Sequence, residues 1–244
     1  VVADPPEKIE DTVVAQLTGE QRKLYLANQD RIAQQVQHRE ASEFKKDKLK
    51  VLAELTKLRQ ICCDPRLHYE DYKAGSAKLD TCMELVHGAL DGGHRILLFS
   101  QFTGMLDIIG KRLAKEDIAF LKLTGASSKE SRAKMVAQFQ AGEVPVFLIS
   151  LKAGGSGLNL VGADTVIHFD PWWNPAAEDQ ATDRAHRIGQ KHKVTVIRMI
   201  TRGSIEEQVV KLGARKREMF DQMITAGEAM PTQLTPEDIR ALFD

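Results

Sequence analysis

Two arginines and a glutamine lie close together in the segment DQATDRAHRIGQ, at residues 179–190. Gln180, Arg184 and Arg187 are spaced i, i+4 and i+7, so on a helix they would project from one face. Guanidinium groups stay charged and bind phosphate oxygens in a bidentate manner, and in phosphoryl transfer such arginines neutralise charge on the γ-phosphate. The same spacing also suits a solvated charged face that pairs with nearby acidic residues, so both interpretations remain open.

A second candidate is the glycine-rich segment SLKAGGSGLNL, at residues 150–160. Its glycines permit positive φ and the close approach of a ligand or another backbone. Ser150 and Lys152 precede the glycines and could hold a phosphate, with the lysine acting as a point charge. The alternative is a tight strand-to-helix turn that needs glycine for its geometry. The segment is not a GxGxxG fingerprint.

These residues need a scaffold, and the second part of the chain predicts one. Short runs rich in β-branched or aromatic residues occur at 95–99, 118–123, 145–150, 165–169 and 194–200. Helical stretches at 103–115, 128–140 and 175–187 separate several of them. Alternating strands and helices predict right-handed crossovers and an α/β fold, a parallel sheet with helices on both faces. Ligands bind such sheets at the carboxyl ends of the strands.

Helices predominate elsewhere. Thr18 and Gln21 have the spacing of a capping box, which predicts a helix up to about Lys50. Further helical patterns run from Leu49 to a stop at Pro65, at 76–90, at 204–226 and in the tail at 234–243. In the tail, Thr235 would be the cap and Pro236 the first helical residue. The arginine segment has its own start signal, because Asn174 precedes Pro175, and Gly189 would end that helix.

Composition limits the function classes. The chain has 244 residues and a formal net charge of zero, which argues mildly against a dedicated basic nucleic-acid module. No apolar run reaches the length of about 18 residues that a transmembrane helix needs. The three cysteines are expected to be reduced thiols in a cytoplasmic protein. The N-terminal sequence reads as a chain cut out of a longer one.

Several long motifs, in a fixed order, resemble the C-terminal lobe of Swi/Snf-type ATPases, a branch of the superfamily-two helicases. They are HRILLFSQF (94–102), FLKLTGASSKESR (120–132), LISLKAGGSGLNLVGADTVIHFDPWWNP (148–175) and DQATDRAHRIGQ (179–190). Stretches at 8–25, 58–65 and 76–86 resemble the segments that precede this lobe. The resemblance covers nearly the whole chain, and the residues in the motifs are most similar to those of bacterial members.

The resemblance implies a RecA-like lobe that faces ATP held on a first lobe. Arg184 and Arg187 match the arginine fingers of the family, with Gln180 beside them. Matches to the nucleotide-side glycine motif are Gly155, Gly157 and Asn159. Matches to contacts with the phosphates of one DNA strand are Ser100, Gln101, Thr103, Ser150 and Lys152. Trp173 matches a tryptophan near the DNA groove, although a packed aromatic anchor is an equal alternative for it and for Trp172.

Two expected elements of an ATP site are absent from the sequence. There is no GxxxxGK[ST] P-loop and no Asp-Glu dipeptide, and the resemblance assigns both to the first lobe. We therefore expect ATP and Mg²⁺ to be held mainly by that lobe, and this chain alone to be inactive. No protein-bound metal is expected here. Expected partners are the first lobe, double-stranded DNA and a DNA-bound protein, with no membrane, in the bacterial nucleoid or the eukaryotic nucleus.

The resemblance also divides the chain. We expect residues 1–93 to form the linker and a helical protrusion, 94–203 the RecA-like lobe, and 204–244 helices closing on it. Basic residues of the protrusion could contact DNA or the other lobe, or form a solvated face; these are Arg31, Arg39, Lys45, Lys46, Lys48 and Lys50.

The sequence leaves one other class of function open and argues against another. One is a stand-alone nucleic-acid-binding or interaction module on the same scaffold. The other, a small-molecule enzyme, lacks a proton-transfer constellation, and His168 and His186 are interpreted as packing or polar residues.

Overall fold

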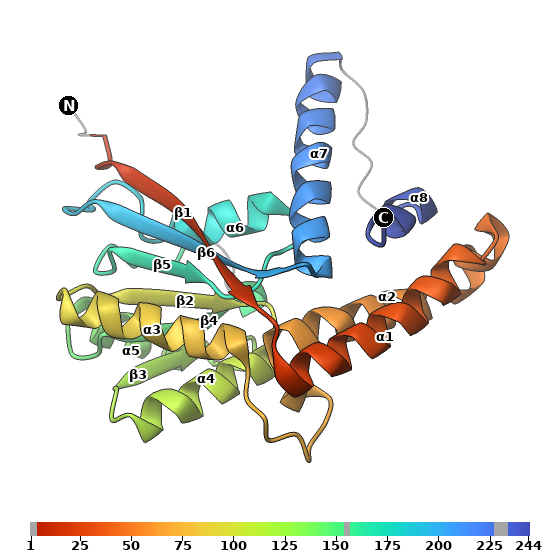
Figure 1. The fold of residues 1–244 in the computed structure, drawn as a ribbon. Helices are drawn as coiled ribbons and strands as arrows, with labels where there is room; N and C mark the ends of the chain where they lie inside the picture. Colours follow the sequence, from red (N-terminus) through yellow and green to blue (C-terminus); the bar gives the residue numbers. More distant parts are fainter. Residues whose placement is uncertain (1–3, 154–156, 227–233) are drawn as a thin grey trace. The chain divides into compact units, whose positions relative to one another are not determined.

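A computed structural model describes residues 4–153, 157–226 and 234–244. The chain divides into two compact units (Figure 1). The first unit comprises Val1–Ala15, Lys78–Pro171 and Ala176–Ile200. The second unit comprises Gln16–Ala77, Trp172–Pro175 and Thr201–Asp244. Each unit therefore combines segments that are distant in the sequence, and the division does not follow the expected boundaries at 93 and 203.

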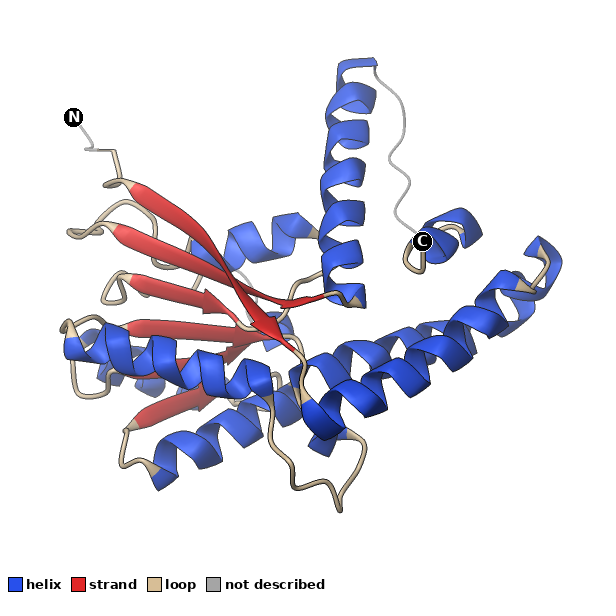
Figure 2. Cartoon of the chain, viewed as in Figure 1, coloured by secondary structure: helices blue, strands red, loops and turns tan. Residues whose placement is uncertain are grey.

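The first unit contains a six-stranded sheet with the strand order β1-β6-β5-β2-β4-β3 (Figure 2). The strands are β1 (Lys8–Gln16), β2 (Ile96–Ser100), β3 (Phe120–Leu123), β4 (Val146–Ser150), β5 (Thr165–His168) and β6 (Val194–Arg202). The ladders of β2 with β4 and β5, of β3 with β4 and of β5 with β6 are all parallel. The predicted α/β class with a parallel sheet is confirmed.

Helices cover both faces of this sheet. They are α3 (Ala77–Asp91), α4 (Thr103–Lys115), α5 (Lys129–Gln140) and α6 (Pro175–Thr182). Phe99, Phe147 and Val166 pack with residues of α5 and α6 on one face. Their neighbours along the strands alternate to the opposite face, as the pleat requires. There Gly110 of α4 approaches Phe120 and Leu148 so closely that an added Cβ would lie 3.0 Å from the Phe120 ring.

The second unit is helical. It contains α1 (Gly19–Gln37), α2 (Ala41–Cys63), the short 3₁₀ helix η1 (Pro65–Leu67), α7 (Ile205–Ala226) and α8 (Pro236–Ala241). Its core includes Tyr25, Leu58 and Val209, which come from α1, α2 and α7. This unit therefore has a hydrophobic core of its own. Burial of each such side chain contributes about 2 kcal/mol to the free energy of folding.

The five strands predicted for the second part of the chain are confirmed, as are α3, α4, α5 and α7 within a residue or two. The tail helix α8 also begins as predicted, with the Thr235 hydroxyl accepting a hydrogen bond from the backbone N–H of Asp238. Strand β1 was missed. It lies at the edge of the sheet and is mostly exposed, so it lacks the apolar run that marks a buried strand.

Two predictions about the N-terminal helices are wrong. Thr18 precedes α1 but makes no side-chain capping bond. Gln21 is buried instead, where its amide donates to the carbonyl of Ile61 at 3.0 Å and accepts from the backbone N–H of Ala77 at 3.1 Å. The single helix expected up to Lys50 is two helices, because a new start occurs at Glu40, whose backbone N–H donates to the Glu43 carboxylate.

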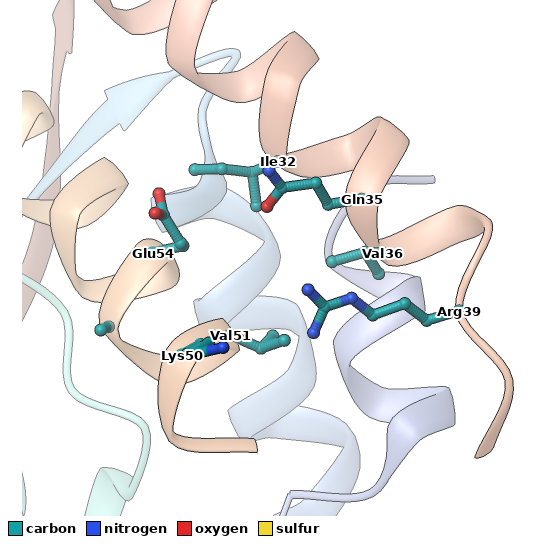
Figure 3. A pocket seen from close by; sticks show the side chains of 8 residues that line it. Ile32, Gln35, Val36, Arg39, Lys50, Val51 and Glu54 are labelled. Atoms are coloured by element: carbon teal, nitrogen blue, oxygen red, sulfur yellow. The ribbon is translucent and has the colours of Figure 1, made fainter. Parts of the chain in front are cut away.

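A hollow of about 310 Å³ lies between α1 and α2 (Figure 3). Its lining residues are Ile32, Gln35, Val36, Arg39, Lys50, Val51, Ala53 and Glu54. Three basic side chains in this region are paired: Arg31 with Glu54 at 2.6 Å, and Arg39 and Lys50 with Asp47 at 3.4 and 3.5 Å. These pairs reduce the positive charge that the helical hairpin presents to a partner. Arg39 and Lys50, two of the basic residues that could contact DNA or the other lobe, line this hollow, whereas the residues predicted for the nucleotide and for the DNA phosphates do not.

None of the helices in the described part of the chain is long and apolar enough to cross a membrane.

Candidate functional site: two polar clefts of the parallel-sheet unit

The first cleft, here called the arginine cleft, has a volume of about 740 Å³. It brings together Gln180, Arg184, Arg187 and Gly157, four of the residues predicted to act on a nucleotide. The remaining lining residues are Pro5, Leu158, Asp183, His186 and Ile188. Two guanidinium groups facing one open space can neutralise a polyanion such as a triphosphate.

The local structure behind this cleft differs from the prediction. Helix α6 begins at Pro175, as expected, but it ends at Thr182 instead of continuing to residue 187. Only Gln180 is on the helix, and Arg184 and Arg187 lie in the turns that follow. The single helical stripe is therefore wrong, although the three side chains still line one cleft. Gly189, at φ +98°, belongs to the turns after the arginines.

Ion pairs fasten α6 to the sheet. Arg198 of β6 donates through Nε to the carboxylate of Glu178 at 3.1 Å, and its Nη1 lies 3.3 Å from Glu10 of β1. Its third acidic neighbour is Asp179, at 3.5 Å. Despite partial burial, this acidic surrounding raises the pKa of Arg198. The start of α6 is thus tied to two strands, which fixes the segment that leads to the arginines.

The two arginines of the cleft have different surroundings. Arg184 is only 9% exposed, its guanidinium carbon lies 5.6 Å from the centre of the Phe99 ring, and burial lowers its pKa. Arg187 is exposed. A buried guanidinium remains charged but loses hydration, so an anion entering the cleft gains more from Arg184 than it would from a solvated arginine.

The second cleft, here called the phosphate cleft, has a volume of about 530 Å³. Its lining includes four of the five residues that were predicted to contact the phosphates of one DNA strand: Gln101, Thr103, Ser150 and Lys152. Its other lining residues are Asp107, Lys122, Thr124, Gly125 and Ala126. Strands β2, β4 and β3 are neighbours in the sheet, and all three end at this cleft. This is the edge at which open parallel sheets bind ligands.

Ser100, the fifth predicted DNA contact, has no exposed surface. Its hydroxyl donates to Asp170 at 2.5 Å and accepts from the backbone N–H of Phe102 at 3.1 Å. The buried Asp170 carboxylate also accepts from the backbone N–H of Gln101 at 3.2 Å. The buried hydroxyl of Ser100 therefore shapes the loop that leads to Gln101 and Thr103, and its contact with a DNA phosphate stays a prediction.

The glycine-rich segment runs from one cleft to the other. Lys152, near its start, lines the phosphate cleft, and Gly157, towards its end, lines the arginine cleft at φ +103°. Gly155, predicted to lie near the nucleotide, is outside the described residues. Asn159 is exposed but does not line the arginine cleft. The segment connects two candidate ligand surfaces over a few residues.

The tryptophans lie in the helical unit. Trp173 is partly buried against the core of that unit, and the guanidinium carbon of Arg59 lies 4.7 Å from its ring centre. The same guanidinium lies 5.9 Å from the ring of Trp172. This placement is that of a packed aromatic anchor, the alternative that the sequence left open, and neither tryptophan lines a described cleft of the sheet unit.

Sequence reasoning missed Lys122 and Thr124 as residues of the phosphate cleft. Lys122 forms an ion pair with Asp107 across this cleft. The signal was present, because Thr124 directly follows the last residue of β3 and polar residues at strand ends are candidates in any open parallel sheet. Among the described residues, no group of three His, Cys, Asp or Glu side chains could hold a metal ion.

Comparison with known proteins gives the same assignment as the motifs. The helicase conserved C-terminal domain model matches residues 77–189. A Bacillus subtilis protein with the provisional name ATP-dependent helicase/translocase YwqA is 38% identical over 251 residues, which cover 100% of this chain and 27% of that protein. A Mycoplasma pneumoniae relative, an uncharacterized ATP-dependent helicase, is 36% identical, again over 100% of this chain and 23% of its own length. The chain thus spans about a quarter of these curated relatives.

Solved structures extend the comparison to the fold. The C-terminal domain of the Sulfolobus solfataricus SWI2/SNF2 ATPase is 33% identical, with a TM-score of 0.75 over 97% of this chain and 98% of that domain. The ATPase core from the same organism, solved in complex with double-stranded DNA, is 36% identical with a TM-score of 0.77, over 97% of this chain and 50% of the core. The chain belongs to the Swi/Snf-type ATPases of helicase superfamily two and corresponds to their C-terminal, RecA-like lobe.

Proposed function

We propose that this chain is the second motor lobe of an ATP-dependent translocase on double-stranded DNA. In this proposal the lobe completes an ATPase site whose other half lies on a first lobe, and it holds the phosphates of one DNA strand. The observation that carries the proposal is the glycine-rich segment with one end in the arginine cleft and the other in the phosphate cleft.

The arginine cleft supports the catalytic half of the proposal. Arg184 and Arg187 would engage the γ-phosphate of ATP held by the first lobe, and Gln180 lies beside them. Their charge would offset the negative charge that develops on the transferred phosphoryl group, an effect of roughly 10³–10⁵ in rate. This chain has no P-loop and no Asp-Glu pair, so phosphate cradling and Mg²⁺ binding belong to the partner lobe.

The phosphate cleft supports the DNA half. Lys152 supplies a positive charge, and Gln101, Thr103 and Ser150 supply hydrogen-bonding groups. Ser150 is the last residue of β4, and Thr103 is the first residue of α4. Contacts of this kind position a protein on the backbone without reading bases, which suits a motor that moves along any sequence. The Sulfolobus core with bound double-stranded DNA is consistent with this assignment.

Coupling between the two halves would pass through the glycine-rich segment. When the first lobe closes with ATP on the arginine cleft, Gly157 and its neighbours contact a new surface, and the strand end with Ser150 and Lys152 is a few residues away. As the lobes close and reopen, each lobe in turn would bind the DNA backbone more tightly. Hydrolysis would then produce translocation without strand separation. A binding ligand can shift such an equilibrium only through its different affinities for the two states.

The alternative is a stand-alone nucleic-acid-binding module on a helicase-lobe scaffold. Both proposals expect this chain alone to release no phosphate from ATP, because the P-loop is absent. They differ once the first lobe is present: the motor proposal expects DNA-stimulated hydrolysis, whereas the module expects none.

Phosphate release should therefore be measured for the isolated chain and for the full-length protein, each with and without duplex DNA. The motor proposal expects turnover in the full-length protein with DNA and no turnover in the isolated chain. Robust hydrolysis by the isolated chain would contradict it, and so would a DNA-bound full-length protein that hydrolyses no ATP.

A further inference from the structure

A buried histidine lies behind the arginine cleft, and the proposed mechanism does not use it. His168, the last residue of β5, is 1% exposed. Its Nε2 shares a hydrogen bond with the hydroxyl of Thr182 at 3.0 Å. Its Nδ1 has no hydrogen-bond partner within the described part of the chain. The bond to Thr182 therefore anchors the imidazole, and Thr182 is the last residue of α6.

Thr182 directs the turn that carries the arginines. It is 1% exposed, and its carbonyl accepts hydrogen bonds from the backbone N–H groups of Ala185 at 3.0 Å and His186 at 3.1 Å. On the other side of this turn, the carbonyl of Arg184 accepts from the backbone N–H of Leu160 at 2.9 Å. A shift of Thr182 would therefore move the backbone on which Arg184 is mounted.

The side chain of Arg184 is linked to His168 by the ring of Phe99, which contacts both residues. Its guanidinium lies 5.6 Å from the Phe99 ring, and Phe99 stacks on His168 with ring centres 5.6 Å apart and planes 21° apart. The contacts thus form a closed circuit from His168 to Thr182, through the turn to Arg184, and by way of Phe99 back to His168. Such a circuit fixes both the backbone and the side chain of one arginine.

We propose that His168 and Thr182 are positioning residues that hold Arg184 in the orientation needed to contact the γ-phosphate at the transition state. The inference rests on the proposed function of Arg184 as an arginine finger. It goes beyond that function by assigning the orientation to one hydrogen bond behind the cleft.

The charge state of the histidine fits this role. Burial, reinforced by the positive charge of Arg198, lowers the pKa of His168 to about 3. The imidazole is therefore neutral near pH 7, so it adds no positive charge behind the Phe99 ring that faces the Arg184 guanidinium. A neutral ring can stack on Phe99 and still use Nε2 for the bond to Thr182.

The test uses pairs of variants in the full-length protein with saturating duplex DNA. Thr182→Val removes the hydroxyl at nearly constant volume, whereas Thr182→Ser keeps it. His168→Phe removes the same bond from the other side and keeps an aromatic ring on Phe99. Arg184→Ala reports on the finger itself. Measurements are kcat and KM for ATP, the Kd for DNA, and the melting temperature.

Because a misplaced catalytic group costs rate rather than binding, we expect Thr182→Val and His168→Phe each to lower kcat by about tenfold or more. We expect KM and the DNA Kd to stay within about twofold, and Thr182→Ser to retain kcat. Combining Thr182→Val with His168→Phe should cost little more than either change alone, since both remove one bond.

The outcomes separate the inference from the function on which it rests. If Arg184→Ala abolishes turnover while Thr182→Val keeps kcat, or if Thr182→Ser loses as much as Thr182→Val, the positioning role is refuted and the finger stands. If Thr182→Val lowers kcat, KM and the DNA affinity together with the melting temperature, the bond is only structural and the inference fails. If Arg184→Ala itself leaves kcat unchanged, both proposals fail.

Discussion

Burial separates the charged and titratable residues of the two clefts into those that ligands can reach and those that hold the others in place. Arg187 and Lys152 are exposed, whereas Arg184 is nearly buried and His168 and Asp170 are fully enclosed. In the enclosed group, each side chain contacts a residue that lines a cleft, or a residue next to one. Changes of exposed residues should therefore alter ligand binding, whereas changes of enclosed residues should alter stability or the orientation of their neighbours.

His168 gives a prediction for the dependence of stability on pH. In the folded chain its pKa is about 3, against an ordinary value of 6.5, so below pH 6.5 the unfolded chain binds a proton that the folded chain does not. Stability is then lost as pH falls from about 6.5 towards 3, at up to about 1.4 kcal/mol per pH unit. Replacing His168 by Asn should remove about 2 kcal/mol of the loss between about pH 7.5 and pH 5. Urea unfolding at several pH values tests this, and parallel pH profiles for parent and variant would contradict it.

Lys152 gives a prediction for DNA binding. If it contacts one phosphate, Lys152→Ala should weaken binding equally for all sequences and reduce the slope of log K against log salt by about one. Lys134→Ala, on the exposed surface of α5, is the matched control. Fluorescence titrations at several salt concentrations measure both quantities. An unchanged slope in the Lys152 variant would remove this residue from the DNA contacts.

The role of a single residue could be predicted where its chemical type and its place in a motif pointed to the same contact. It could not be predicted where burial determines which groups a side chain can reach. The sequence predicted that Gln180, Arg184 and Arg187 lie on one face of a helix; the helix ends before the two arginines, and the three side chains still line one cleft. The resemblance to the family also assigned Ser100 to the DNA phosphates, and nothing in the sequence indicated that this side chain would be buried. Only the three-dimensional structure places Asp170, seventy residues later, against its hydroxyl.

At the scale of elements, the ion pairs of Arg198 with Glu178 and Asp179 hold α6 against the sheet. Glu178 is buried to 7% exposure and bonds Arg198, so Glu178→Gln leaves Arg198 with only Glu10 and Asp179. Breaking a buried pair costs about 3–5 kcal/mol, and the remaining acidic partners of Arg198 reduce this to about 1–3 kcal/mol. Chemical denaturation of the chain measures the change, with Glu84→Gln on exposed α3 surface as the control. Equal stability of the two variants would show that the pair does not anchor α6.

Strands and helices were predictable wherever hydrophobic periodicity was strong. The buried strands β2 and β4 are continuous apolar runs, whereas the edge strand β1 is mostly exposed and gives no such signal. The end of α6 was also missed, because charged residues with helical spacing continue past Thr182 into the turns. Gln21 shows the same limit, since its partners Ile61 and Ala77 come from distant segments.

At the scale of the whole molecule, the chain is about a quarter of the length of its curated relatives. It carries arginines and a phosphate cleft without the residues that cradle ATP. In the function proposed above, this lobe acts in a composite site, where the geometry created by closure determines the rate. The activity of the complete protein should therefore depend on residues of this chain that never bind ATP by themselves.

The most direct test of this account is DNA-stimulated ATP hydrolysis by the full-length protein carrying Arg187→Ala. Arg187 is exposed in the arginine cleft, so its removal should leave the fold and the melting curve unchanged. We predict a fall in kcat of about 10³ or more, with DNA binding retained, and no loss in the control Arg22→Ala on the exposed face of α1. Full DNA-stimulated turnover in a normally folded Arg187 variant would contradict the composite site.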